Sequence, residues 1–310
     1  MTEKFVELHQ RLADTVLGAE EPAYLLLIAL LCDGHVLIEG TPGIGKTSLA
    51  HALARSIDCD FKRIQFTPDL LPSDIIGYSM FRQDLNQFQF VPGPVFSNIV
   101  LADEINRTSP RIQSALLECM NEQQVTIDGV TRKLESPFFV IATQNTSHAA
   151  GVFPLPEAQL DRFLICIEMV VPPEETEVAI LRHHADGKPG QNVQDLQPIM
   201  HADELIEAHR AVERVAVADT ICSYIVRLAN AARSHRELAS NLSPRASIAL
   251  MRAAQASAFL EKQNAVYPDD VKRVAAAVLR HRVSAAIGPE AAGVDVDGCL
   301  GEILRRTPAP

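Results

Sequence analysis

A glycine-rich pattern that can bind phosphate, G-x-x-x-x-G-K-[ST], is matched by residues 40–47 between an apolar strand-like segment and a helix-like segment. In such a loop the backbone N–H groups point inward at a phosphate. We expect Lys46 to reach the β- and γ-phosphates and the Thr47 hydroxyl to coordinate Mg²⁺. The residues expected to contact the nucleotide are Thr41, Pro42, Gly43, Ile44, Gly45, Lys46, Thr47 and Ser48.

Two acidic residues, Asp103 and Glu104, directly follow the apolar segment 98–102. A carboxylate at the end of a strand beside the phosphate loop suits a metal-bridging role, so Asp103 would hold Mg²⁺ through water. Glu104 would polarise the attacking water as a general base or a water-orienting group. Together with the phosphate loop, this pair predicts Mg²⁺-dependent hydrolysis of ATP.

Three further polar residues lie at positions where they could contact a nucleotide. Asn145 follows the buried segment 138–143, Arg162 directly precedes the segment 163–170, and Arg245 follows Ser243-Pro244 at an expected helix start. An amide at a strand tip could touch a phosphate, but it could equally cap a loop. Ser243 and Pro244 are also ordinary helix-start residues, so these positions alone leave the roles open.

The segments that position these residues alternate between strand and helix from residue 23 to about residue 169. Strand-length apolar runs occur at 35–39, 61–66, 99–102, 138–143 and 163–170, and helix-period segments at 48–56 and 111–122. Such alternation predicts a parallel sheet covered on both faces. Residues 80–96 and 125–134 interrupt it, and the second contains Asp128-Gly129, a strong hairpin signal. We expect each to form an inserted β-hairpin.

Downstream of residue 171 the pattern becomes helical, with expected helices at 174–184, 202–215, 221–232, 245–261 and 270–281. The predicted fold class is therefore α/β, with a second, all-helical region. We expect an α/β nucleotide-binding domain in residues 1–171 and a smaller helical domain in residues 172–310.

Composition limits the possible partners and compartments. The chain has 310 residues, 47% hydrophobic and 22% charged, with a net charge of −11. The acidic excess lies within residues 1–189, which argues against nucleic acid as the main partner. The longest apolar run, residues 23–32, is about half the ~20 residues of a membrane helix. Scattered cysteines without a CxxC pair and a start unlike a secretory signal predict a cytoplasmic protein.

The sequence resembles the AAA+ ATPases and, within them, the MoxR family, from about residue 16 to about residue 282. The matching stretches are GTPGIGKT (40–47), RIQFTPDLLPSDIIG (63–77), GPVFSNIVLADEINR (93–107), ATQN (142–145), LPEAQLDRF (155–163) and SPRA (243–246). The resemblance implies a P-loop AAA+ core with a helical lid domain. Residues 146–150 depart from the proline and polar or acidic run expected after ATQN.

Roles for the polar residues follow from this resemblance. Asn145 would be the sensor-1 residue that probes the γ-phosphate, Arg245 would be sensor 2, and Gly18 would lie near the adenine. Arg162 would be the arginine finger that reaches the ATP site of the neighbouring subunit. Two other arginines, Arg107 and Arg111, are competing candidates for that finger.

The resemblance also implies an assembly and a cellular task. The active form would be a homo-oligomeric ring, usually a hexamer, in which residues 80–96 and 125–134 are the helix-2 insert and the pre-sensor hairpin. It would act as a chaperone that remodels or matures a client protein, together with a partner that carries a von Willebrand factor A domain. The alternatives are a nucleic-acid motor of the helix-2-insert class and a chelatase-type ATPase subunit.

Overall fold

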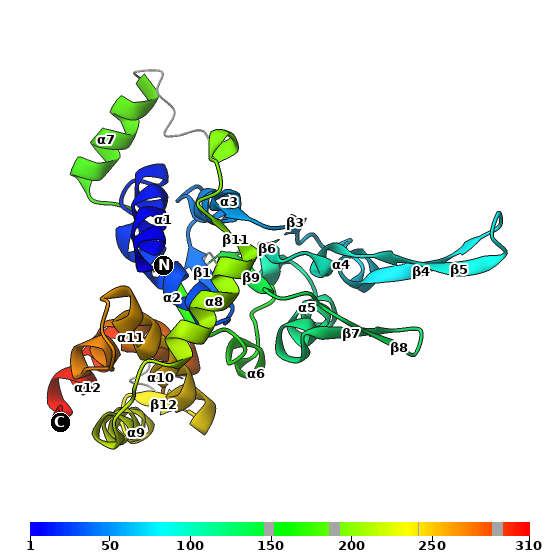
Figure 1. The fold of residues 1–310 in the computed structure, drawn as a ribbon. Coiled ribbons are helices and arrows are strands. Elements are labelled where there is room, and N and C mark those ends of the chain that lie inside the picture. The colour runs from blue at the N-terminus through cyan, green and yellow to red at the C-terminus, as the bar shows by residue number, and fades with distance from the viewer. Residues whose placement is uncertain (146–151, 186–192, 241, 287–293) are drawn as a thin grey trace.

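The computed structural model describes residues 1–145, 152–185, 193–240, 242–286 and 294–310. Its centre is a sheet of five parallel strands, which confirms the predicted α/β core (Figure 1). In spatial order the strands are β10 (Ile165–Met169), β1 (Val36–Gly40), β9 (Phe139–Asn145), β6 (Ile99–Asp103) and β3 (Phe61–Gln65). The segment 146–150, whose sequence departs from the family pattern, lies outside the described residues.

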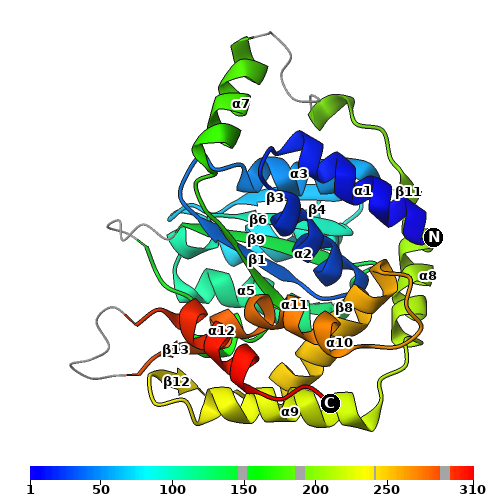
Figure 2. The same ribbon diagram turned by 90° about the vertical axis from the view of Figure 1, so that its left-hand side faces the viewer.

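Both faces of this sheet are buried, which explains why its strands are almost continuously apolar. Alternate side chains enter two hydrophobic clusters: Val36 and Ile38 point to one face, and Leu37 points to the other. The first face is covered by α1 (Thr2–Thr15), α2 (Glu20–Leu31) and α3 (Lys46–Ser56) (Figure 2). The second face is covered by α5 (Pro110–Glu122).

The structure has the two predicted β-hairpins, and both extend from the same side of the molecule (Figure 1). The longer pairs β4 (Gly77–Arg82) with β5 (Gln87–Pro92), and the shorter pairs β7 (Gln124–Ile127) with β8 (Val130–Lys133). The shorter one turns at Asp128 and Gly129, which have φ of 51° and 76°, as a tight two-residue hairpin requires. Its Arg132 guanidinium lies 4.0 Å from the ring centroid of Phe90 on β5, so the hairpins touch. The short helices α4 (Pro72–Ile76) and η1 (Pro94–Phe96) directly precede and follow the longer hairpin. Two more, η2 (Ile105–Arg107) and α6 (Glu157–Leu160), follow β6 and precede β10.

The C-terminal region is predominantly helical, as predicted. Its helices are α7 (Glu174–Ala185), η3 (Val193–Asp195), α8 (Ala202–Glu213), α9 (Asp219–Arg233), α10 (Pro244–Leu260), α11 (Pro268–Leu279), η4 (Arg280–Arg282) and α12 (Val296–Arg306). Among the longer helices, α1, α2 and α12 were not predicted from the sequence, and neither were two small strand pairs. These pair β2 (Ile57–Asp58) with β11 (Met200–His201), and β12 (Leu238–Ser240) with β13 (Val283–Ala285). None of the helices described here has both the length and the apolar character of a membrane span.

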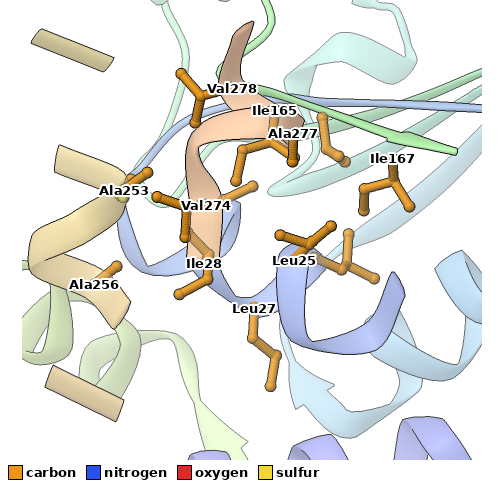
Figure 3. Packing of buried hydrophobic residues seen from close by; sticks show 14 of the residues in the cluster. Leu25, Leu27, Ile28, Ile165, Ile167, Ala253, Ala256, Val274, Ala277 and Val278 are labelled. Atoms are coloured by element: carbon orange, nitrogen blue, oxygen red, sulfur yellow. The ribbon is translucent and has the colours of Figure 1, made fainter. Parts of the chain in front are cut away.

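The C-terminal helices share a hydrophobic core with the first face of the sheet. Figure 3 shows Ile28 of α2 and Ile165 of β10 close to Ala253 of α10 and Val274 of α11. Burial of such side chains contributes roughly 1.5–3 kcal/mol each for the larger aliphatic residues, so this junction is a major part of the packing.

Polar contacts of η4 strengthen the same junction. Arg282 donates from Nε to Asp161 Oδ1 at 2.8 Å and from Nη2 to the carbonyl oxygen of Phe163 at 2.7 Å. His281 Nε2 lies 2.9 Å from that carbonyl oxygen. The segment between α6 and β10 is therefore anchored by the C-terminal helices.

Candidate active site

The phosphate loop lies between β1 and α3, in the strand–loop–helix arrangement predicted from the sequence. Gly43 and Gly45 have φ of 82° and 99°, a left-handed conformation that is costly for residues with a side chain. These conformations turn the loop sharply toward the N-terminus of α3, where unpaired N–H groups favour an anion. The loop is thus shaped to surround a phosphate.

Lys46 is buried at the start of α3, with 8% of its surface exposed. Its Nζ donates to the carbonyl oxygens of Gly40 and of Thr41, the latter at 2.9 Å, and lies 3.5 Å from Asn145 Oδ1. Burial lowers the pKa of Lys46, while Asp103 and Glu104 oppose that shift. The ammonium group is therefore held inside the loop, beside the tip of β9.

Asp103 and Glu104 lie at the carboxyl edge of the sheet, where β6 ends next to β9. Glu104 has a φ of 57°, a conformation uncommon for a non-glycine residue, and its amide donates to Thr143 Oγ1 at 2.9 Å. The Thr143 hydroxyl in turn donates to Asp103 Oδ1 at 2.6 Å. One buried hydroxyl thus fixes the backbone of one acidic residue and the side chain of the other.

Three side chains surround the Glu104 carboxylate. Asn145 Nδ2 lies 3.4 Å from Oε1, while Gln65 Nε2 and Arg107 Nη1 donate to Oε2 at 3.0 and 2.9 Å. Since Asn145 also faces Lys46, its amide connects the ammonium of the phosphate loop with the carboxylate at the end of β6.

Thr47 and Asp103 provide a donor set suited to Mg²⁺. Thr47 Oγ1 lies 3.3 Å from both carboxylate oxygens of Asp103. Hydroxyl and carboxylate oxygens fit Mg²⁺, which in nucleotide sites takes its remaining ligands from phosphates and water. No group of three or more His, Cys, Asp or Glu side chains in the described part of the chain could hold a metal by itself. The residues present therefore fit a metal that arrives together with a nucleotide.

A cavity of about 460 Å³ opens beside the phosphate loop. Gly18 lies in its wall, together with Ile44 of the loop and Val171 and Ile180 from the chain after β10. The mixture of apolar side chains and loop backbone suits a planar base next to a phosphate. The full lining is Asp14–Ala19, Thr41–Gly45, Ser48, Met169–Pro172, Glu177, Ile180 and Leu181.

Two of the predicted site residues, Arg162 and Arg245, lie away from this site. Arg162 precedes β10 and so lies at the amino edge of the sheet, about 16 Å along a five-residue strand from the edge that carries the phosphate loop. Its Nη1 donates to the carbonyl oxygen of Leu117. Arg245 is exposed in the first turn of α10, where its amide donates to the capping Ser243 hydroxyl at 3.2 Å. Neither arginine lines the cavity.

Three residues of this site were not predicted from the sequence: Arg63, Gln65 and Thr143. Arg63 Nη2 donates to Asp103 Oδ2 at 2.6 Å, and Gln65 and Thr143 contact the acidic pair as described above. Each lies at or near the end of a strand whose neighbour had already supplied a candidate. The carboxyl edge of a parallel sheet collects such residues, so strand order was the signal that could have found them.

Comparison with known proteins places the fold and the site in a defined class. Residues 35–165 match the family described as "ATPase family associated with various cellular activities (AAA)", and residues 230–298 match the AAA lid domain. A crystal structure from Cytophaga hutchinsonii, of a protein assigned as an ATPase, superposes with a TM-score of 0.88 at 38% identity. It covers 100% of this chain and 96% of its own. The protein is an AAA ATPase, a class of protein that binds and hydrolyses ATP.

Full-length relatives define the family more narrowly. The chaperone MoxR1 of Mycobacterium tuberculosis is 38% identical over 95% of this chain and 79% of its own length. The uncharacterized protein YeaC of Bacillus subtilis is 46% identical over 95% of this chain and 91% of its own. The chain belongs to the MoxR family of AAA ATPases, as the motif strings indicated.

Proposed function

We propose that the protein is a cytoplasmic, Mg²⁺-dependent ATPase that assembles as a homo-oligomeric ring, most simply a hexamer. The ring uses ATP turnover to remodel or mature a client protein together with a partner that carries a von Willebrand factor A domain. The name of MoxR1 as a chaperone supports the client-directed task. The α/β domain comprises residues 1–171 and the helical domain residues 172–310, and nucleotide turnover moves one relative to the other.

The observation that carries the proposal is the bridge made by Asn145 between Lys46 and Glu104. A γ-phosphate held by Lys46 would lie within reach of the same amide that positions the Glu104 carboxylate. Glu104 then orients the attacking water and accepts its proton, while Asn145 senses the phosphate. Thr47 and Asp103 would hold Mg²⁺, which neutralises charge on the phosphates when it is bound.

The position of Arg162 supports a ring. An arginine at the amino edge of the sheet cannot reach the phosphates bound at the carboxyl edge of its own subunit. We therefore assign Arg162 as the finger that stabilises transition-state charge in a neighbouring subunit. Arg107, by contrast, donates to Glu104 of its own chain. Arg245, as sensor 2, would report movement of the helical domain, and Gly18 would contact the adenine.

The hairpins do not favour a nucleic-acid motor, because their arginines already have partners. Arg82 pairs with Asp84 at 2.7 Å, and Arg132 stacks on Phe90. The charge of Arg82 is thereby neutralised, and the shorter hairpin has only Arg132 and Lys133 against Asp128, so the hairpins offer little net positive charge to a phosphate backbone.

Two variants test the enzymatic part of the proposal. Lys46→Ala should lose binding of a fluorescent ATP analogue, while Glu104→Gln should keep that binding and lower steady-state ATP hydrolysis at least a hundredfold, a range typical of general bases. Normal hydrolysis by Glu104→Gln would overturn the role given to this carboxylate. The same variant, held in its ATP state, is suited to capture of the client and the partner.

A further inference from the structure

The carboxylate of Asp103 already has a cationic partner. Arg63 donates to Asp103 Oδ2 twice, from Nη2 at 2.6 Å and from Nε at 3.1 Å. The Asp103 side chain is 7% exposed, whereas that of Arg63 is 45% exposed. A buried carboxylate needs a compensating charge, and Arg63 supplies it from a half-exposed position.

The remaining acceptor positions of Asp103 are occupied as well. Oδ1 accepts from the Thr143 hydroxyl at 2.6 Å, and Thr47 Oγ1 lies 3.3 Å from both oxygens. An ionised carboxylate accepts about four hydrogen bonds, so this one has no free position. Arg63 makes the two shortest contacts to Oδ2, so water bound to a metal would take the place where its guanidinium now lies.

The same guanidinium group reaches a second residue of the site. Arg63 Nη2 also donates to Gln65 Oε1 at 2.7 Å, which turns the other end of that amide toward Glu104 Oε2 at 3.0 Å. Arg63 therefore connects the carboxylate expected to hold the metal with the amide that contacts Glu104.

We propose that Arg63 is the resting counter-ion of Asp103 and that the metal ion displaces it. This inference rests on the proposed function, in which Thr47 and Asp103 hold Mg²⁺. The two cations compete for one carboxylate, so the metal can bind only by breaking the Arg63 contacts, which lowers its net affinity for the site. Release is feasible because the guanidinium is half exposed and can turn into water without desolvation. Arg63 is a positioning residue, since it acts on the metal through Asp103.

The test measures binding and needs no turnover. The dissociation constant of a fluorescent, non-hydrolysable ATP analogue is determined with EDTA and with Mg²⁺. The value in EDTA divided by the value in Mg²⁺ isolates the contribution of the metal to binding. In Arg63→Gln this ratio should rise about tenfold over the wild type, because a charge-assisted hydrogen bond no longer opposes the metal. General effects of the lost charge on ATP affinity cancel in the ratio. Lys62→Gln, which removes an exposed charge from the same strand, should leave the ratio unchanged.

An unchanged or smaller ratio in Arg63→Gln overturns the inference, provided that the wild type binds more tightly with Mg²⁺. A wild-type ratio of one, or no binding of the analogue at all, contradicts the proposed metal site instead. If Arg63→Gln does not fold, Arg63→Lys should show a smaller rise, because an ammonium group cannot make the paired contact. A wild-type structure with analogue and Mg²⁺ gives a check without variants: an intact Arg63–Asp103 pair beside the bound metal would also overturn the inference.

Discussion

The hydroxyl of Thr143 donates its hydrogen to Asp103 at 2.6 Å and accepts the amide hydrogen of Glu104 at 2.9 Å. Thr143 has none of its surface exposed, so no water can take over either bond. The position of the acidic pair therefore depends on a buried, uncharged side chain outside the phosphate loop.

Thr143→Val keeps the shape of the side chain and removes both bonds. It should lower the free energy of unfolding by about 1–3 kcal/mol, because the half-buried Glu104 amide and a buried Asp103 carboxylate oxygen each lose a partner. Hydrolysis should fall more than nucleotide binding, since Lys46 and the loop remain intact. Urea unfolding and steady-state ATPase assays measure the two effects. Thr220→Val, which removes an exposed hydroxyl from α9, is the matched control and should change neither.

Arg162→Ala should abolish ATP hydrolysis while leaving nucleotide binding intact if, as we propose, the guanidinium acts on a neighbouring subunit. Mixing it with inactive Lys46→Ala should restore part of the activity, since some interfaces then combine an intact loop with an intact arginine. ATPase assays over a series of mixing ratios give the measurement. No recovery at any ratio would count against a finger acting between subunits. The same mixing experiment with Arg111→Ala tests the competing candidate.

The contact between Arg132 and Phe90 should couple the two hairpins energetically. In a double-mutant cycle of Arg132→Met and Phe90→Leu, we expect a coupling free energy of about 0.5–1 kcal/mol, as for other partly exposed cation–π pairs. Urea denaturation of the four proteins measures it. Lys133→Met with Phe90→Leu serves as the control pair and should show no coupling, because Lys133 is exposed on the neighbouring position of β8. Strictly additive effects in the first pair would show that the hairpins are independent.

Stability should decrease as the pH falls below about 6.5, the ordinary pKa of histidine. His35 is buried, its Nδ1 accepts the Val140 amide at 3.1 Å, and its Nε2 lies 3.0 Å from the Met120 carbonyl oxygen. Burial lowers the pKa of His35, and it lowers the pKa of His281 well below the ordinary value. Below pH 6.5 the unfolded chain therefore binds protons that the folded protein does not.

Each such histidine should reduce the free energy of unfolding by up to about 1.4 kcal/mol per pH unit, until its own folded pKa is reached. Above pH 6.5 both states are neutral and the contribution is fully present. Urea unfolding between pH 5.5 and 7.5 provides the slope. His35→Gln and His281→Gln should each make that slope shallower, even though they lower stability at neutral pH. A slope unaffected by either change would contradict this explanation.

Much of the fold follows from local patterns in the chain. The apolar runs, the Asp128-Gly129 turn and the helix start at Ser243-Pro244 each record a local physical requirement, and the structure has a strand, a hairpin and a helix there. The helix α2 is different, because residues 23–31 are buried and apolar on all sides of the helix. Such a run has no period that distinguishes a buried helix from a strand.

The network around the acidic pair could not be derived from spacing alone. Arg63 and Thr143 are far apart in the chain and contact the same carboxylate, that of Asp103, only because β3 and β9 both neighbour β6. Strand order is a property of the whole fold, whereas the phosphate loop is contiguous and carries its own signal. The sequence therefore predicts the residues expected to touch the nucleotide better than those that hold them in place.

The anchoring of residues 161–164 by η4 has a consequence for communication around a ring. Arg282 and His281 hold the residues on both sides of Arg162, the first through Asp161 and both through the Phe163 carbonyl oxygen. A tilt of the C-terminal helices would thus shift Arg162 through its own peptide bonds. In the proposed ring, the nucleotide state of one subunit would reach the next through a displacement of the main chain at Asp161 and Phe163. These residues lie directly on either side of Arg162 in the sequence.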